Sequence, residues 1–417
     1  MKQRSRMRNA VLTAAIAAAL VPGGLVPGGL EMAGIASAAP PAQAARSAHG
    51  FSRPRCAEAS PGHMRCFLLY RPQVAVDQAM VAGLSAKPHG WTPAQLRSAY
   101  KLPTRATSDQ TVAISIPFHT PDLASFLATY RRQFGLPPCT VASGCFQQVN
   151  QQGNATPAEP SATGTGWDLE ATLDVSMVSV ACPACKILVV EAKNTTIASL
   201  GVTEVTAARL GAQAISNSYG TFEIAGVRPF EKDWDLRDHT VVAASGDNGF
   251  ATPQFPADIA SVTAVGGTKL ARAAGTRRGR TETAWIGSGS GCSTLIAKPA
   301  WQHDTKCKGR TVADISAVAT NVPIFETTYG GWVSVNGTSI AAPLVAGIYG
   351  LAGNGANVGH VGLYRHGRSF FDVTKGNNAF SNGFSPSQDC GNNYICVAKK
   401  GYDAPTGLGT PDGISGF

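Results

Sequence analysis

Apolar residues along this chain fall into two alternating patterns: short continuous runs, and longer segments with a three- or four-residue spacing. The short runs predict buried strands at residues 111–116, 186–190, 214–216, 240–245 and 261–265. The spaced segments predict helices at residues 91–101, 121–134, 167–180, 199–210 and 339–352. Strands that are apolar along their whole length alternate with helices, so we expect an α/β fold with a doubly wound, mostly parallel central sheet and helices on both faces.

Two local features sharpen this prediction. Thr92 and Pro93 are typical of an N-cap and a first helical residue. The segment 339–352 is apolar on all sides, which predicts a buried helix. Ligands of doubly wound sheets bind beyond the carboxyl ends of the strands, so polar residues that follow a predicted strand are candidates for a functional site.

The amino-terminal residues have the pattern of a secretory signal peptide. Four basic residues between positions 2 and 8 precede an apolar run at 10–21, and residues 36–38 form a small-residue cleavage site. The run is short for a membrane span and glycines follow it, which makes a membrane anchor the weaker alternative. We expect residues 1–38 to be a signal peptide, the protein to be secreted, and no stable membrane association.

Composition limits what the rest of the chain can be. Of 417 residues, 44% are hydrophobic and 15% are charged, so the chain can bury a large core and is not disordered throughout. The net charge of +9 is spread along the sequence without a stripe of basic and aromatic residues. We therefore expect no nucleic-acid partner, and we expect a monomer.

The ten cysteines fall in close couples, as in a disulfide-bonded exported protein. The Cys-x-x-Cys at 182–185 would also suit a redox motif or half a zinc site, but no second Cys-x-x-Cys or close His pair accompanies it. Short loops gain little from cross-linking, so such bonds would staple loops rather than build the core. The predicted disulfides are Cys56–Cys66, Cys139–Cys145, Cys182–Cys185, Cys292–Cys307 and Cys390–Cys396.

A serine at the start of the predicted buried helix is the first candidate for chemistry. Ser339 follows a Gly-Thr turn and precedes Pro343 by four residues. The free N–H groups and the dipole at a helix N-terminus favour negative charge, so this is a place to hold an oxyanion. The alternative is that Ser339 only caps the helix.

Three carboxylates are further candidates. Glu170 and Asp174 are four residues apart on a predicted helix, so they share one face, where like charges repel. If buried, such a pair shares a proton and suits a general base oriented by a second acid; the alternative is a solvated polar face. Asp247 follows the strand at 240–245 within Ser-Gly-Asp-Asn-Gly, where a site residue or a turn residue would both fit.

These motifs together resemble those of the sedolisins, the serine-carboxyl peptidases of the subtilisin-like fold. The resemblance runs from about residue 91 to the C-terminus. It rests on the Glu-x-x-x-Asp helix, Ser245–Gly249, Val262–Thr268, Ala313–Ala317, Gly-Thr-Ser-x-x-x-Pro and Gly401–Pro411. Unlike subtilisins, the chain has Glu170 in place of the His-Gly-Thr motif, and Pro117 and Phe118 where the first strand would end in Asp.

The resemblance implies a catalytic domain at residues 91–417, preceded by a short N-terminal region or propeptide at residues 39–90. It implies a secreted serine-carboxyl endopeptidase that cleaves protein or peptide substrates through an acyl-enzyme on Ser339. Glu170 would take the serine proton, Asp174 would orient Glu170, and Asp247 would donate a hydrogen bond to the oxyanion. A carboxyl group donates only when protonated, whereas the base must be ionised. With ordinary carboxyl pKa values near 4, both conditions are met together only in acid, so we expect an acidic optimum.

The C-terminal region carries a candidate calcium site. Asp372 and Asp403 lie in glycine-rich turns, where carboxylates and free carbonyls suit this hard cation or where Asp simply forms turns. The resemblance implies one structural Ca²⁺ on Asp372, Val373, Lys399, Gly401 and Asp403. The family favours Gly-x-Gly-x-Asp here, and Lys399 and Lys400 would weaken a bound cation.

Two alternatives remain open at the level of sequence. A subtilisin-type serine peptidase would need a histidine, and only His119 stands near a predicted helix start, followed by Thr120-Pro121 rather than Gly-Thr. A catalytically silent binding protein on the same scaffold would not need the serine and all three carboxylates.

Overall fold

The structure is a computed structural model that describes residues 56, 60–71, 87–104, 110–155, 160–276, 278–353, 361–379 and 390–417. The predicted signal peptide lies outside the described residues, as does much of the predicted N-terminal region. The described residues all belong to one structural unit, residues 44–417. None of the helices in these ranges is long and apolar enough to cross a membrane.

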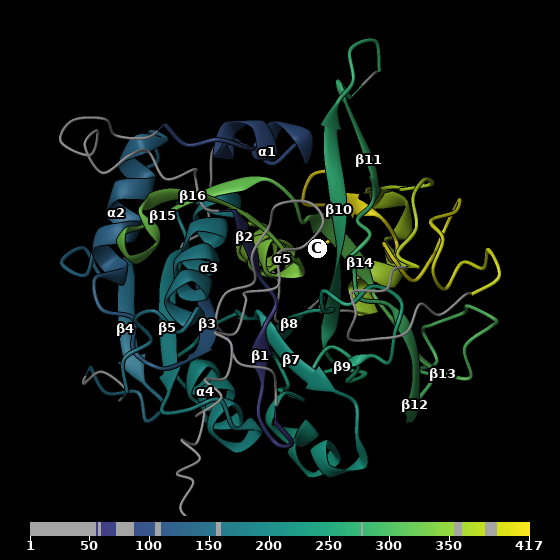
Figure 1. Cartoon of the computed structure of the whole chain (residues 1–417), viewed down its shortest axis with the longest axis horizontal. Helices are drawn as coiled ribbons and strands as arrows, with labels where there is room; N and C mark the ends of the chain where they lie inside the picture. Colours follow the sequence, from purple (N-terminus) through teal and green to yellow (C-terminus); the bar gives the residue numbers. More distant parts are fainter. Residues whose placement is uncertain are drawn as a thin grey trace, which may run out of the picture. The chain divides into compact units, whose positions relative to one another are not determined.

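A central eight-stranded sheet organises the molecule (Figure 1). Its main path runs β11-β10-β8-β6-β3-β5-β4, and β14 also pairs with β10. All of these pairings are parallel except that of β11 with β10. The strands are β3 (Thr111–Pro117), β4 (Phe146–Asn150), β5 (Lys186–Ala192), β6 (Ala214–Asn217), β8 (Thr240–Ala244), β10 (Thr263–Arg272), β11 (Arg280–Ala284) and β14 (Ile315–Val318).

Helices cover both faces of the sheet, as the sequence predicts. Val112 and Ile114 of β3 belong to the large core that includes α3 (Trp167–Ala181) and α5 (Thr338–Ala352). Ala113, between them, belongs to a second core with residues of α4 (Ile197–Arg209). Successive side chains of a strand point to opposite faces, so α4 covers the face opposite α3 and α5. The doubly wound α/β prediction is confirmed.

Two more helices lie at the edge of this layer. α1 (Pro93–Ala99) begins as predicted, with the Thr92 hydroxyl accepting from the Gln95 amide and the Gln95 side chain accepting from the Thr92 amide. This capping box satisfies two amides that the helix leaves free. α2 (Leu123–Gln133) packs against α3.

Small antiparallel sheets surround the central one. β1 (Arg65–Cys66), β7 (Tyr219–Phe222) and β9 (Gln254–Phe255) form one, and β15 (Val322–Glu326), β16 (Gly331–Asn336) and β2 (Leu69–Arg71) form another. β12 (Gly291–Ala297) pairs with β13 (Gly309–Val312), and β17 (Phe370–Phe371) pairs with β18 (Thr410–Pro411). Short 3₁₀ helices are η2 (Ala225–Asp233), η3 (Thr327–Tyr329) and η4 (Gly367–Ser369).

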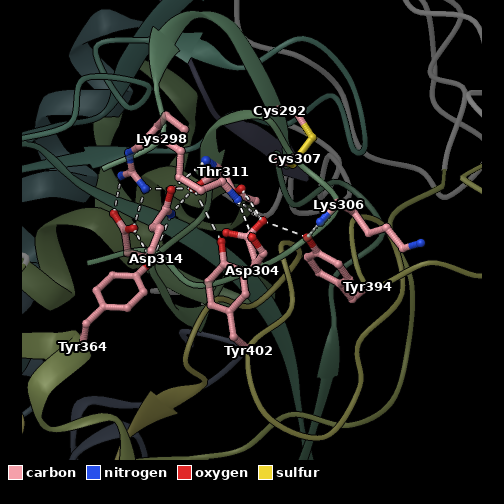
Figure 2. A network of polar contacts seen from close by, with 12 residues as sticks. Cys292, Lys298, Asp304, Lys306, Cys307, Thr311, Asp314, Tyr364, Tyr394 and Tyr402 are labelled. Carbon is pink, nitrogen blue, oxygen red and sulfur yellow. Dashed lines mark hydrogen bonds and ion pairs between the residues drawn. A yellow bond between two sulfur atoms is a disulfide. The ribbon is translucent and has the colours of Figure 1, made fainter. Parts of the chain in front are cut away.

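A buried polar network ties the C-terminal loops to this body (Figure 2). Arg310, which is fully buried, binds both carboxylate oxygens of Asp314 at 2.5 and 2.6 Å, and Tyr364 donates to the same carboxylate at 2.7 Å. Asp304 accepts from Lys298 and from Tyr394, each at 2.7 Å. The five predicted disulfides are all present, and Cys292–Cys307 lies beside this network in Figure 2.

Candidate active site

Ser339 lies at the start of α5 and is fully buried. The chain reaches it through Gly337, whose φ of 144° is a conformation that side chains with a Cβ rarely adopt. The Ser339 hydroxyl donates to the backbone carbonyl of Ser218 at 3.3 Å. Ser339 is therefore held in the first turn of a buried helix, where the free amides favour negative charge.

Glu170 and Asp174 lie on α3 next to α5, and neither side chain is exposed. The loop before α3 is fixed by Asp168, whose carboxylate accepts from the amides of Gly164 and Gly166. The predicted solvated-face alternative is therefore wrong, because every residue of α3 is buried. The helix instead places two acids inside the protein.

The pKa values of this pair follow from burial. Burial raises the pKa of Glu170 well above its ordinary value, and the charges of Asp174 and Asp247 raise it further, while the Ser339 hydroxyl lowers it. Burial likewise raises the pKa of Asp174, and its hydrogen bond from Ser218 opposes this. Neither oxygen of Glu170 makes a hydrogen bond of good geometry among the described residues, although the Ser339 hydroxyl lies close enough to lower the Glu170 pKa. Two acids so placed titrate as a unit, so their two protons are lost in steps that belong to the pair rather than to either residue.

Ser218 connects the serine and the acids, although it lies outside the motifs that the sequence displays. Its hydroxyl donates to Asp174 at 2.6 Å, and its carbonyl accepts from Ser339. Ser218 directly follows β6, and a polar residue in that position after a buried strand is the sequence signal that could have identified it.

Asp247 approaches Ser339 from the end of β8. Its Oδ1 accepts from the amide of Thr338 at 2.8 Å and from the Thr338 hydroxyl at 2.9 Å. A Cβ placed on Gly337 would lie 2.9 Å from the other oxygen, Oδ2. Because Oδ1 already accepts two hydrogen bonds, a proton on this carboxyl group would reside on Oδ2. Asp247 is therefore held at the N-terminus of α5, one residue from Ser339.

Comparisons with known proteins identify a family and a solved structure with the same fold. Residues 153–359 match the subtilase family, peptidase S8. The solved structure of Pseudomonas sedolisin, a serine-carboxyl proteinase in complex with pseudo-iodotyrostatin, superimposes with a TM-score of 0.62 over 78% of this chain and 96% of that chain, at 22% identity. The chain is a sedolisin-like protein with the subtilisin-like fold.

Curated relatives match over part of their length. Kumamolisin of Bacillus sp. (strain MN-32) is 30% identical over 79% of this chain and 63% of its own length. Tripeptidyl-peptidase sed4 of Aspergillus fumigatus is 29% identical over 48% of this chain and 42% of its own. The sedolisin-like chain thus spans less than two thirds of these relatives.

His119, the histidine considered for a subtilisin-type base, has partners other than Ser339 in the described part of the structure. His119 Nδ1 binds Glu191 at 2.9 Å, and Gln148 donates to the same glutamate at 2.5 Å. The groups that bear on Glu170 are instead Asp174, Asp247 and Ser339. Carboxyl groups, rather than His119, therefore lie beside Ser339.

The predicted calcium residues lie on two neighbouring loops. Asp372 accepts from the Gly401 amide at 3.0 Å, and Asp403 accepts from the Lys399 amide at 2.8 Å. Burial, with a smaller effect of the Asp372 charge, raises the pKa of Asp403 to about 7. Val373 is buried between these loops and the rest of the chain. No group of three or more His, Cys, Asp or Glu residues within the described ranges forms a metal cluster, so a cation here would depend on two carboxylates and backbone carbonyls.

Proposed function

We propose that this chain is a secreted serine-carboxyl endopeptidase that hydrolyses protein or peptide substrates. The observation that carries the proposal is the placement of Ser339, Glu170, Asp174 and Asp247 around one point at the N-terminus of α5. The tripeptidyl-peptidase name of the Aspergillus relative and the serine-carboxyl proteinase title of the Pseudomonas structure support a peptidase of this chemistry. The predicted signal peptide and the five disulfides support secretion.

In this mechanism the buried acid pair acts as the base. With one proton shared by Glu170 and Asp174, the monoanion accepts the Ser339 proton while Oγ attacks the scissile carbonyl carbon. The Ser218 hydroxyl holds Asp174 in place. When the tetrahedral intermediate collapses, the C–N bond breaks and Glu170 returns the proton to the departing amine. Water then attacks the ester carbon while Glu170 takes a proton from it, and Glu170 returns that proton to Ser339 Oγ as the ester bond breaks.

The tetrahedral oxyanion needs donors in the same place. The Ser339 amide is one, and Asp247, protonated on Oδ2, is the second. Asp247 donates only when neutral, so the working range is acidic. Burial raises the pKa of Glu170, so the ordinary value near 4 assumed from sequence does not apply to the base. The acid limb of the rate profile then reflects the pair as a whole rather than one residue.

We also propose one structural Ca²⁺ on the loops described above. Asp372 and Asp403 would hold it, together with the carbonyls of Val373, Lys399 and Gly401. The charge of Asp372, which helps to raise the pKa of Asp403, supports this, because a divalent cation would offset the charge of both carboxylates. When bound, the ion would tie the two loops together and take no part in the peptide chemistry.

The function is tested by digestion of a denatured protein at pH 3–5 with the purified chain and two serine variants. Ser339→Ala should lower the rate by roughly 10⁵–10⁶-fold. Ser176→Ala removes an equally buried serine of α3 that donates to the Thr172 carbonyl, and it should retain activity. Equal activity of Ser339→Ala and the wild type would contradict the proposal. An inactive wild type that binds peptides would favour the silent binding protein.

A further inference from the structure

An extended segment of the N-terminal region, residues 62–71, lies across the candidate active site. Before the site, the Gly62 carbonyl accepts from Ile197 at 3.0 Å, and the Met64 amide donates to Thr195 at 2.8 Å. β1 then pairs antiparallel with β7, and β2 pairs antiparallel with β16 (Figure 1). The segment is therefore held on both sides of Ser339 by main-chain pairing, in the way that an extended peptide adds to a sheet edge.

Phe67 and Leu68 are the two residues between these strands. The Phe67 amide donates to the Ser218 carbonyl at 3.3 Å, and the Phe67 carbonyl accepts from the Ser339 amide at 3.4 Å. A Cβ on Gly337 would lie 2.3 Å from the Phe67 carbonyl oxygen and 2.9 Å from Asp247 Oδ2. The Phe67 carbonyl thus occupies the place where the mechanism needs an oxyanion, beside both donors.

The Phe67 side chain fills a pocket of its own. It is 2% exposed, and its ring tip faces two glycines. A Cβ on Gly220 would lie 2.7 Å from the ring carbon Cζ, and one on Gly246 would lie 3.8 Å from it. The backbone of Phe255 closes the same pocket beside Gly220. The absence of side chains at these two positions makes room for a large aromatic ring.

We infer that Phe67–Leu68 is the chain's own scissile bond, and that the Gly220–Gly246 pocket selects a large apolar side chain immediately before the bond that is cleaved. The inference rests on the proposed acylation of Ser339, and it adds the substrate class. It also implies that residues 62–71 occupy the active site of the uncleaved chain and exclude other peptides until the bond is cut.

The step balances with water as co-reactant. Ser339 Oγ forms an ester with the Phe67 carbonyl carbon as the bond to the Leu68 nitrogen breaks, and Glu170 passes the serine proton to that nitrogen. Water hydrolyses the ester and leaves a carboxylate on Phe67. The disulfide Cys56–Cys66 lies entirely before the broken bond, so it does not tether the released segment to the body.

Processing is tested on the full chain. Wild type and Ser339→Ala are incubated at pH 4, and the amino terminus and the intact mass are then determined. The wild type should begin at Leu68, while Ser339→Ala should keep the bond intact. A wild type that digests casein but retains the Phe67–Leu68 bond, or begins elsewhere, would overturn this inference and leave the proposed function standing. A wild type that cleaves neither would refute the function itself.

The pocket is tested in trans, so that the result does not depend on folding of a segment variant. Peptides spanning residues 64–71, with Cys66→Ser, carry Phe, Leu or Asp at position 67. We expect kcat/KM for Phe to exceed that for Asp by at least about 10²-fold, with Leu between them. Gly220→Ala, which intrudes on the ring, should lower kcat/KM for the Phe peptide at least tenfold and reduce its advantage over a peptide with Ala at this position. An unchanged ranking in Gly220→Ala would overturn the assignment of the pocket.

Discussion

Asp247 illustrates at the scale of one residue how hydrogen bonds decide what a carboxyl group can do. Thr338 donates twice to Oδ1, through its amide and its hydroxyl, which fixes the side chain. The remaining oxygen borders the position of the Phe67 carbonyl. A neutral acid can donate from this oxygen, whereas a carboxylate would repel an oxyanion there.

Asp247→Asn tests that role through the pH profile. An amide with its oxygen facing Thr338 presents an N–H group at the Oδ2 position at every pH. We expect the variant to remain active above the pH at which the wild type falls, when kcat/KM is measured from pH 3 to 9. Asp247→Ala, which lacks the donor, should lose about 10²–10³ in kcat throughout. Superimposable profiles for Asp247→Asn and the wild type would show that Asp247 does not set the alkaline limb.

At the scale of elements, the sequence predicted the helices and strands whose formation depends on the local spacing of apolar residues. The apolar spacing in α3 and α5 is strong, so both helices and the burial of Ser339 followed from it. The strands of the small sheets were missed because β1, β2 and β16 are short or contain polar residues and depend on distant partners. The same reason explains why Ser218 and Phe67 were not recognised. Their significance comes from contacts with Ser339, over a hundred residues away in the chain.

The loops around Asp372 and Asp403 lead to a prediction about stability rather than about catalysis. If Ca²⁺ ties these loops, adding millimolar Ca²⁺ after EDTA treatment should raise the Tm, by about 1 °C for each kcal/mol of binding in a unit of this size. Asp403→Asn should abolish the shift. Lys375→Ala, which removes an exposed cation nearby, should retain it. The same Tm with and without Ca²⁺ would rule out the site.

For the whole molecule, buried acids determine how stability depends on pH. Burial raises the pKa of Glu170 and Asp174, and it raises the pKa of Glu204 and of Asp258 to about 8 each. The folded state therefore retains protons that the unfolded chain loses above about pH 4. Stability contributed by these groups falls as pH rises from about 4 toward 8.

We accordingly expect thermal unfolding to show a higher Tm at pH 4 than at pH 8. Glu170→Gln and Glu204→Gln each remove one such acid, so the Tm gain of each variant over the wild type should grow as pH rises. The two should differ in activity, because Glu204 bonds to Asn217 while Glu170 lies beside Ser339. A wild-type Tm that increases steadily from pH 4 to 8 would contradict this ionisation scheme.

The central claim is that a buried carboxyl group, not an imidazole, activates Ser339. The most direct test is the single-turnover rate of acylation at pH 3–9 for the wild type, Glu170→Gln and His119→Gln. We predict that the acylation rate of the wild type is highest at acidic pH. Glu170→Gln should lower this rate by about 10²–10⁴-fold, and His119→Gln should keep it within about threefold of the wild type. Normal acylation by Glu170→Gln, or its loss in His119→Gln, would contradict the account.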